Sequence, residues 1–269
     1  LYAAEADKSL DVPRQVDLLA RLARISEQEV NDVPAAIGTY RRILDVEFDN
    51  KPAVLALDRL YTQTQAWPEL TEILRREIQL AEDDAEVATL QYRLGATLEH
   101  RQGDRKAAVE VYREIISANP THGETIAALE QMFHAGHHQG PVGAILEPLY
   151  ETANENEKLH GLFQVQLGAL QGTERQSMYQ RLAELAEHRL YDASRASAWW
   201  GQAYVEDPRW EAAGEHIERL AKDTGGWDDL VAVYTQALAR NAEPELQRQV
   251  LLRMARVSPV SGSNSTVDC

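Results

Sequence analysis

The stretch RLGATLEHRQGDRKAAVEVYREIISANP, residues 93–120, decides the fold because its landmarks recur along the chain. Its opening Arg-Leu-Gly returns in related form at residues 21–23, 181–183 and 253–255, so that successive copies are 72, 88 and 72 residues apart. Further columns keep this register, and they are Ala36, Ala108 and Ala196, then Tyr40, Tyr112 and Trp200, then Ile43, Ile115 and Ala203. Several aligned columns at one set of offsets indicate an internal repeat.

Within each copy the apolar residues recur with the period of an α-helix. Leu18, Leu22 and Ile25 share one helical face. Proline and glycine lie mainly between such runs, where helices begin and end. No alternating run of β-branched residues competes with this pattern. The sequence therefore predicts an all-α fold of about fourteen short helices, arranged as a right-handed superhelical solenoid of antiparallel hairpins.

The spacing of small and bulky residues resembles that of the tetratricopeptide repeat. The residues that carry this resemblance are Leu94, Gly95, Ala108, Tyr112, Ile115 and Pro120. The usual unit of that family has about 34 residues, whereas this chain pairs two hairpins in each 72-residue step. The second hairpin of each pair is degenerate: in the first copy it contains residues 56–61 and then residues 67–70, and the third copy repeats the latter stretch from Trp227. The resemblance implies a solenoid fold, and a fold alone does not assign a function.

The register also predicts the organisation of the chain. We expect one repeat domain over residues 1–257, with units at 13–84, 85–172 and 173–242 and a partial unit at 243–257. The longer 88-residue step predicts an extra helix near residues 139–151, because residues 145–150 repeat the motif of residues 128–133. Residues 258–269 are expected to be a disordered tail or a leftover of cloning. Neither end resembles a polar capping repeat, which is typical of a piece of a longer array.

Composition excludes several classes of function. The 269 residues include 27 basic and 43 acidic side chains, for a net charge of −16. This balance argues against a nucleic-acid surface or an anionic-membrane surface, which need clustered cations. No apolar stretch reaches the length of about 18 residues that a membrane helix needs. The one cysteine, Cys269, excludes an internal disulfide and a cysteine zinc site. The compartment stays open, with the cytoplasm preferred.

Catalytic motifs are absent from the sequence. It contains no Gly-x-Ser-x-Gly, no glycine-rich phosphate loop and no His-Glu-x-x-His. We therefore expect no enzyme activity and no cofactor. His134, His137 and His138 have a spacing that suits a metal, although the preferred interpretation is a solvated turn. A metal site and a pH-sensitive contact are the alternatives.

The resemblance implies that the first helix of each hairpin lines a concave groove. The candidate partner-binding residues there are Arg24, Glu27, Gln28, Tyr92, Glu99, His100, Gln180, Glu184, Glu187 and His188. Glu27, Glu99 and Glu187 form a column of carboxylates that is expected to face solvent and to bind a segment bearing Lys or Arg. The alternative, which the sequence favours, is that these glutamates pair with neighbouring arginines or only solvate their helices.

The pattern thus predicts a non-catalytic scaffold for protein–protein interaction, which presents an acidic groove to a protein or peptide. Its partner is expected to carry basic residues, and we expect no nucleic acid and no membrane insertion. The alternative is a regulatory or sensor segment of a larger enzyme or transcription regulator.

Overall fold

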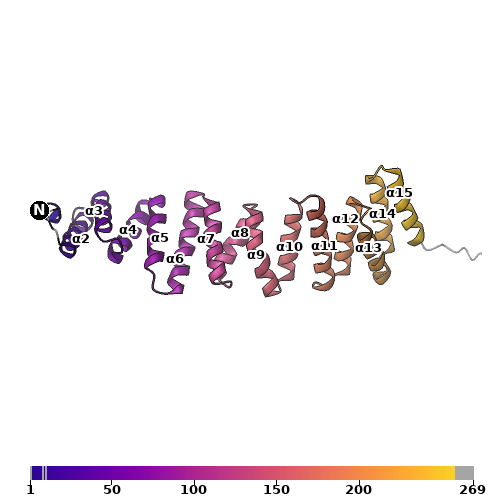
Figure 1. Cartoon of the computed structure of the whole chain (residues 1–269), viewed down its shortest axis with the longest axis horizontal. Coiled ribbons are helices and arrows are strands. Elements are labelled where there is room, and N and C mark those ends of the chain that lie inside the picture. The colour runs from indigo at the N-terminus through magenta and orange to yellow at the C-terminus, as the bar shows by residue number, and fades with distance from the viewer. Residues whose placement is uncertain (1, 8, 10, 258–269) are drawn as a thin grey trace, which may run out of the picture. The chain divides into compact units, whose positions relative to one another are not determined.

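The computed structural model describes residues 2–7, 9 and 11–257, and all regular elements within those residues are helices (Figure 1). The expected tail, residues 258–269, lies outside this range. Contacts between Cα atoms divide the chain into two compact units, residues 1–146 and 147–269. The division falls inside the helix Gln139–Ala153, called α9.

The first unit is a succession of short helices, each of which contacts the next along the chain. These helices are α1 (Tyr2–Ala6), α2 (Val12–Gln28), α3 (Val33–Val46), α4 (Lys51–Thr64), α5 (Trp67–Leu80), α6 (Asp84–Thr97) with the π-helical turn η1 (Leu98–Gln102), α7 (Arg105–Ala118) and α8 (Gly123–His134). Short connections between contacting helices make the neighbours antiparallel. Contacts between neighbours along the chain are the signature of a repeat array.

The second unit is built in the same way. Its helices after α9 are α10 (Asn156–Leu167), α11 (Gly172–His188), α12 (Ala193–Glu206), α13 (Glu211–Thr224), α14 (Trp227–Arg240) and α15 (Pro244–Val257). Here too each helix from α10 onward contacts the next, and α12 also contacts α14. The predicted all-α array of helical hairpins is confirmed.

An aspartate at one repeat position starts the second helix of each first hairpin. The side chains of Asp32, Asp104 and Asp192 accept hydrogen bonds from backbone N–H groups three residues later, at 3.0, 3.0 and 2.9 Å. These bonds satisfy donors that the first turn of a helix otherwise leaves free. The start of α3, α7 and α12 is therefore encoded locally.

The residue before each capping aspartate ends the preceding turn. Asn31, Gly103 and Tyr191 have φ angles of 58°, 72° and 55°, in the left-handed region. Glycine and asparagine adopt this conformation with little strain, whereas a tyrosine does so rarely. Tyr191 is 87% exposed, so that packing does not require an aromatic ring there.

The repeat columns form the core. Ala36, Ala108 and Ala196 are all fully buried. At Gly95, an added Cβ would lie 2.4 Å from the Tyr112 ring, so a larger residue there would force the ring or the helices to shift. The small and aromatic residues thus interlock between helices, as the register predicts.

The second copy contains one more helix than the others in the described part of the chain. It runs from α6 to α10, whereas the first copy runs from α2 to α5 and the third from α11 to α14. Helix α9 covers the place where the 88-residue step predicts an extra helix, and Pro148 lies inside it. Ile145, Leu146 and Tyr150 of this helix are buried, and Leu149 is half-buried.

Candidate functional site

The candidate site is built around three glutamates at one repeat position: Glu27 on α2, Glu99 in η1 and Glu187 on α11. In the first two copies a tyrosine from the next helix reaches the carboxylate. Tyr40 Oη donates to Glu27 Oε2 at 3.4 Å, and Tyr112 Oη donates to Glu99 Oε2 at 3.0 Å. A buried phenol needs an acceptor. Burial, with a further contribution from Glu99, raises the pKa of Tyr112 well above its usual range.

The third copy replaces this tyrosine with Trp200. The Trp200 ring is buried and stacks on His216, with ring centroids 4.3 Å apart and the planes nearly parallel. Its indole Nε1 has no hydrogen-bond partner among the described residues. The aromatic volume is thus kept, while the hydrogen bond to the glutamate is lost.

Arginines neutralise two of the three glutamates. Arg59 on α4 lies 2.6 Å from Glu27, and Arg219 on α13 lies 2.8 Å from Glu187. Each arginine follows its glutamate by 32 residues. The hydrogen bond from Arg219 lowers the pKa of Glu187. In the second copy the same step leads to Gln131, which carries no charge.

Glu99 therefore stands apart from Glu27 and Glu187. Its ionic contact within the described residues is with His100, whose Nε2 lies 3.8 Å from Glu99 Oε2. The three glutamate side chains are 14%, 11% and 16% exposed in chain order, because tyrosines and arginines hold them against the neighbouring helices. The expectation that these glutamates face solvent is wrong. The arginine pairing that was its alternative is confirmed at Glu27 and Glu187, but not at Glu99.

The backbone around Glu99 also differs from that of the other copies. Helices α2 and α11 each run for 17 residues without interruption. The second copy instead changes from α6 into the π turn η1, which Gly103 ends with a φ of 72°. Gln102 Nε2 in this turn donates to the Trp67 carbonyl oxygen at 2.9 Å. Single π turns are rare and are frequent at functional sites.

A cleft of about 520 Å³ opens along α6, and its lining includes Thr89, Asn119 and His122. The Tyr92 ring lies near this cleft, because its centroid is 6.0 Å from the His122 ring and 6.1 Å from the Tyr112 ring. The hydroxyl of Tyr112 bonds Glu99 in turn. The structure therefore connects Tyr92, Glu99 and His100 through Tyr112.

Most of the predicted site residues lie on the surface. Tyr92 is half-buried, whereas the exposed members are Arg24, Gln28, His100, Gln180, Glu184 and His188. Gln180 Nε2 donates to Glu184 Oε1 at 2.7 Å within α11. The residues of the third copy thus present polar groups along one helix.

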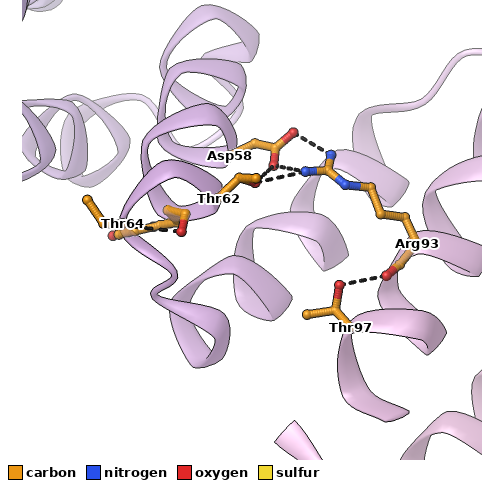
Figure 2. A network of polar contacts seen from close by, with 6 residues as sticks. Asp58, Thr62, Thr64, Arg93 and Thr97 are labelled. Atoms are coloured by element: carbon orange, nitrogen blue, oxygen red, sulfur yellow. Dashed lines mark hydrogen bonds and ion pairs between the residues drawn. The ribbon is translucent and has the colours of Figure 1, made fainter. Parts of the chain in front are cut away.

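Sequence reasoning missed a second polar device, the Arg–acid pairs. These pairs are Asp58–Arg93, Glu147–Arg181 and Glu218–Arg253, with shortest N–O distances of 2.6, 2.5 and 3.1 Å. The Arg93 guanidinium binds both oxygens of Asp58 and also donates to Thr62 Oγ1 (Figure 2). The arginine is the residue that opens each repeat landmark, and the acid precedes it by 34 or 35 residues. This nearly constant step is visible in the sequence and could have predicted the pairs.

The structure also bears on a metal site and on membrane insertion. Among the described residues, no group of three or more His, Cys, Asp or Glu side chains is placed to hold a metal ion. His134 is exposed at the end of α8, and His138 is exposed just before α9. None of the described helices is long and apolar enough to cross a membrane.

No family model and no curated protein matches this sequence. Solved structures with some likeness include the TPR domain of P58(IPK), at 14% identity over 90% of this chain, with a TM-score of 0.37. This chain covers 65% of that one. The TPR2AB domain of yeast Sti1 in complex with pHSP90 is 13% identical, over 91% of this chain and 99% of that one, with a TM-score of 0.36.

YrrB, described as a TPR protein with an unusual peptide-binding site, is 10% identical over 93% of this chain and 97% of its own, with a TM-score of 0.28. Because these identities and TM-scores are low, the assignment of the fold rests on the packing within each unit.

Proposed function

We propose that the protein is a non-catalytic scaffold that binds a protein or peptide segment, and that Glu99 is the anchor for a basic side chain of that segment. The observation that carries this proposal is the missing arginine at Glu99. The equivalent carboxylates Glu27 and Glu187 each have an arginine within 3 Å, whereas the second copy has Gln131 at that step.

The physical argument concerns the neutralisation of a carboxylate that is largely removed from water. A sheltered charge is costly unless it is paired and hydrogen-bonded. The Tyr112 hydroxyl supplies one hydrogen bond to Glu99, but it supplies no charge. The guanidinium or ammonium group of a partner would supply that charge, in the place that Arg59 and Arg219 occupy in the other copies. Charge-assisted bonds of this kind are roughly twice as strong as neutral ones.

Two other features support binding at this place. The π turn makes the backbone around Glu99 and His100 unlike that of the other copies. The cleft of about 520 Å³ is lined by the first part of α6, up to Gln91, and offers room for another side chain of the same segment at a distance from Glu99 along the hairpin. The net charge of −16 also attracts a basic partner over long range.

The test is a selection of short peptides that bind the purified protein from a random display library. We expect the selected peptides to be enriched in Lys and Arg. Glu99→Gln should weaken binding of a selected peptide about tenfold, since a tenfold change corresponds to about 1.4 kcal/mol. The amide oxygen can still accept from Tyr112, so the fold is expected to persist.

Glu27→Gln and Glu187→Gln are the matched controls, because they remove equivalent carboxylates that arginines already neutralise. Each should change affinity less than Glu99→Gln, and the triple variant should lose little more than Glu99→Gln alone. Binding should also weaken as salt rises. Selected peptides without basic residues, or a Glu99→Gln protein that binds as tightly as the unmodified one, would refute the anchor.

A further inference from the structure

A third carboxyl group meets the first Arg–acid pair. Glu77 on α5 is only 6% exposed and lies beside Asp58 and Arg93. Its Oε1 has no hydrogen-bond partner among the described residues. Two neighbouring carboxyl groups cannot both carry a charge without a penalty, whereas one proton between them lets one group donate to the other. A proton on Glu77 would thus satisfy a contact that two carboxylates cannot make.

The cations near Glu77 are already engaged. Both terminal nitrogens of Arg93 on α6 donate hydrogen bonds to Asp58, and one of them also donates to Thr62. Lys51 on α4 faces the small cavity next to Glu77, and its Nζ lies 3.3 Å from Glu82. Lys51 is therefore paired elsewhere.

The remaining charged neighbour is another acid. Glu86 on α6 lines the same cavity, and its Oε2 accepts a hydrogen bond from the Glu82 backbone N–H at 3.2 Å. The other lining residues, Val54, Leu55, Leu80 and Leu90, are apolar. The surroundings of Glu77 thus offer other carboxylates, an arginine that is already paired with Asp58, and apolar side chains, which together favour its neutral form.

The other two copies lack this third carboxyl group. At the position of Glu77, the second copy has Gln166 and the third has Ala237. Both copies nevertheless keep their Arg–acid pairs, Glu147–Arg181 and Glu218–Arg253. Glu77 is therefore not needed to form such a pair, and the later copies serve as internal controls.

We propose that Glu77, Asp58 and Arg93 form a proton-dependent latch, in which a proton held between the two carboxyl groups keeps α4, α5 and α6 closely packed and its loss loosens them. The latch is independent of the peptide anchor at Glu99. It makes the local stability of the first unit depend on pH, while the junctions around Arg181 and Arg253 do not share this dependence.

The direction follows from the proton balance. The pKa of Glu77 is raised from 4.5 to about 7, chiefly by burial and further by the neighbouring Asp58, while Arg93 opposes the rise. The folded junction thus binds this proton more tightly than the open one. Its stabilising effect is fully present below pH 4.5 and is lost as the pH rises through about 7.

The test is hydrogen exchange measured by mass spectrometry between pH 5 and pH 8, corrected for the intrinsic exchange rate at each pH. We expect protection of α4, α5 and α6 to fall about tenfold or more over this range. Glu77→Gln should remove this fall, because an amide does not titrate in this range. The variant should still fold, because Gln166 fills the same place in the second copy. Peptides from α13 to α15 should show no such fall in either protein.

A second variant and a direct titration keep the test decisive. Glu77→Ala copies the residue Ala237 and should also abolish the pH dependence, should Glu77→Gln fail to fold. The ¹³C signal of the Glu77 carboxyl, assigned by its absence in either variant, should titrate near pH 7. A midpoint near 4.5, or an unchanged pH dependence in the variants, would overturn the latch. Neither result bears on peptide binding at Glu99.

Discussion

The hairpins α6–α7 and α11–α12 occupy the same repeat position, yet they differ in which side chain contacts the glutamate of that position. In α6–α7 the buried Tyr112 gives its hydroxyl to Glu99. In α11–α12 the buried Trp200 bonds no carboxylate, and Glu187 turns to Arg219 instead. The comparison shows that both hairpins keep a buried aromatic ring at this position, whereas the polar partner of the glutamate differs between them. A copy in which no arginine pairs with the glutamate can therefore offer that carboxylate to a partner.

The largest expected effect comes from removing the aromatic ring. Tyr112→Ala should destabilise the protein by about 3 kcal/mol, because a large cavity opens and Glu99 loses its hydrogen-bond donor. The loss should appear as faster hydrogen exchange in α6 and α7, since a repeat unit contacts mainly its neighbours.

Tyr112→Phe separates the effect of the cavity from that of the lost hydrogen bond, because it keeps the ring and removes only the hydroxyl. It should lower the free energy of unfolding by only about 1 kcal/mol. Trp200→Ala is the counterpart in the other hairpin and should cost as much as Tyr112→Ala while leaving Glu187 paired. Unchanged exchange in α6 and α7 of the Tyr112→Ala protein would contradict the register.

A smaller effect is expected from Arg219. Of the two hairpins compared, only α11–α12 has its glutamate paired with an arginine. Arg219→Gln should cost about 1 kcal/mol at neutral pH, because Glu187 loses a charge-assisted bond near the surface. Arg219 lowers the pKa of Glu187, so this stabilisation is present above the unfolded value of 4.5 and is lost as the pH falls below it.

The difference between the unmodified and the Arg219→Gln protein in urea unfolding should therefore shrink between pH 6 and pH 3. A constant difference across that range would show that Arg219 acts through packing alone.

The smallest effect concerns the turns that follow the first helix of these hairpins. Tyr191 and Gly103 stand at one repeat position with φ angles of 55° and 72°. Tyr191→Asn should stabilise the protein by about 0.5 kcal/mol, since asparagine tolerates this conformation and the exposed ring contributes little packing. The melting temperature should rise accordingly. Gly103→Ala is the inverse control and should lower it.

The fold was predictable because its determinants are local and repeated. The fully buried column Ala36, Ala108 and Ala196 follows directly from spacing along single helices. The helix near residues 139–151 follows from the longer 88-residue step and from a repeated motif, both of which are visible in the sequence. Secondary structure in such arrays depends on neighbours within one or two hairpins.

The candidate site was predictable only in part, because its electrostatics depend on partners from other helices. The glutamates were recognised as a column, but Arg59 lies 32 residues beyond Glu27 on α4, and no helical period connects them. The π turn at Glu99 has no sequence signature of its own. The surroundings of Glu77 required knowledge of which side chains α4 and α6 place beside α5.

The Arg–acid pairs explain how this array accommodates an odd helix. Each pair joins an arginine to the preceding copy, so a duplication of the whole 72-residue step would carry both partners with it. The insertion in the second copy is different, yet Arg181 still finds an acid, because α9 carries Glu147 one position before its proline. Helix α9 therefore supplies the acid for Arg181, as α4 supplies Asp58 for Arg93. The extra helix in the second copy thus leaves Arg181 paired, because α9 supplies the acid itself.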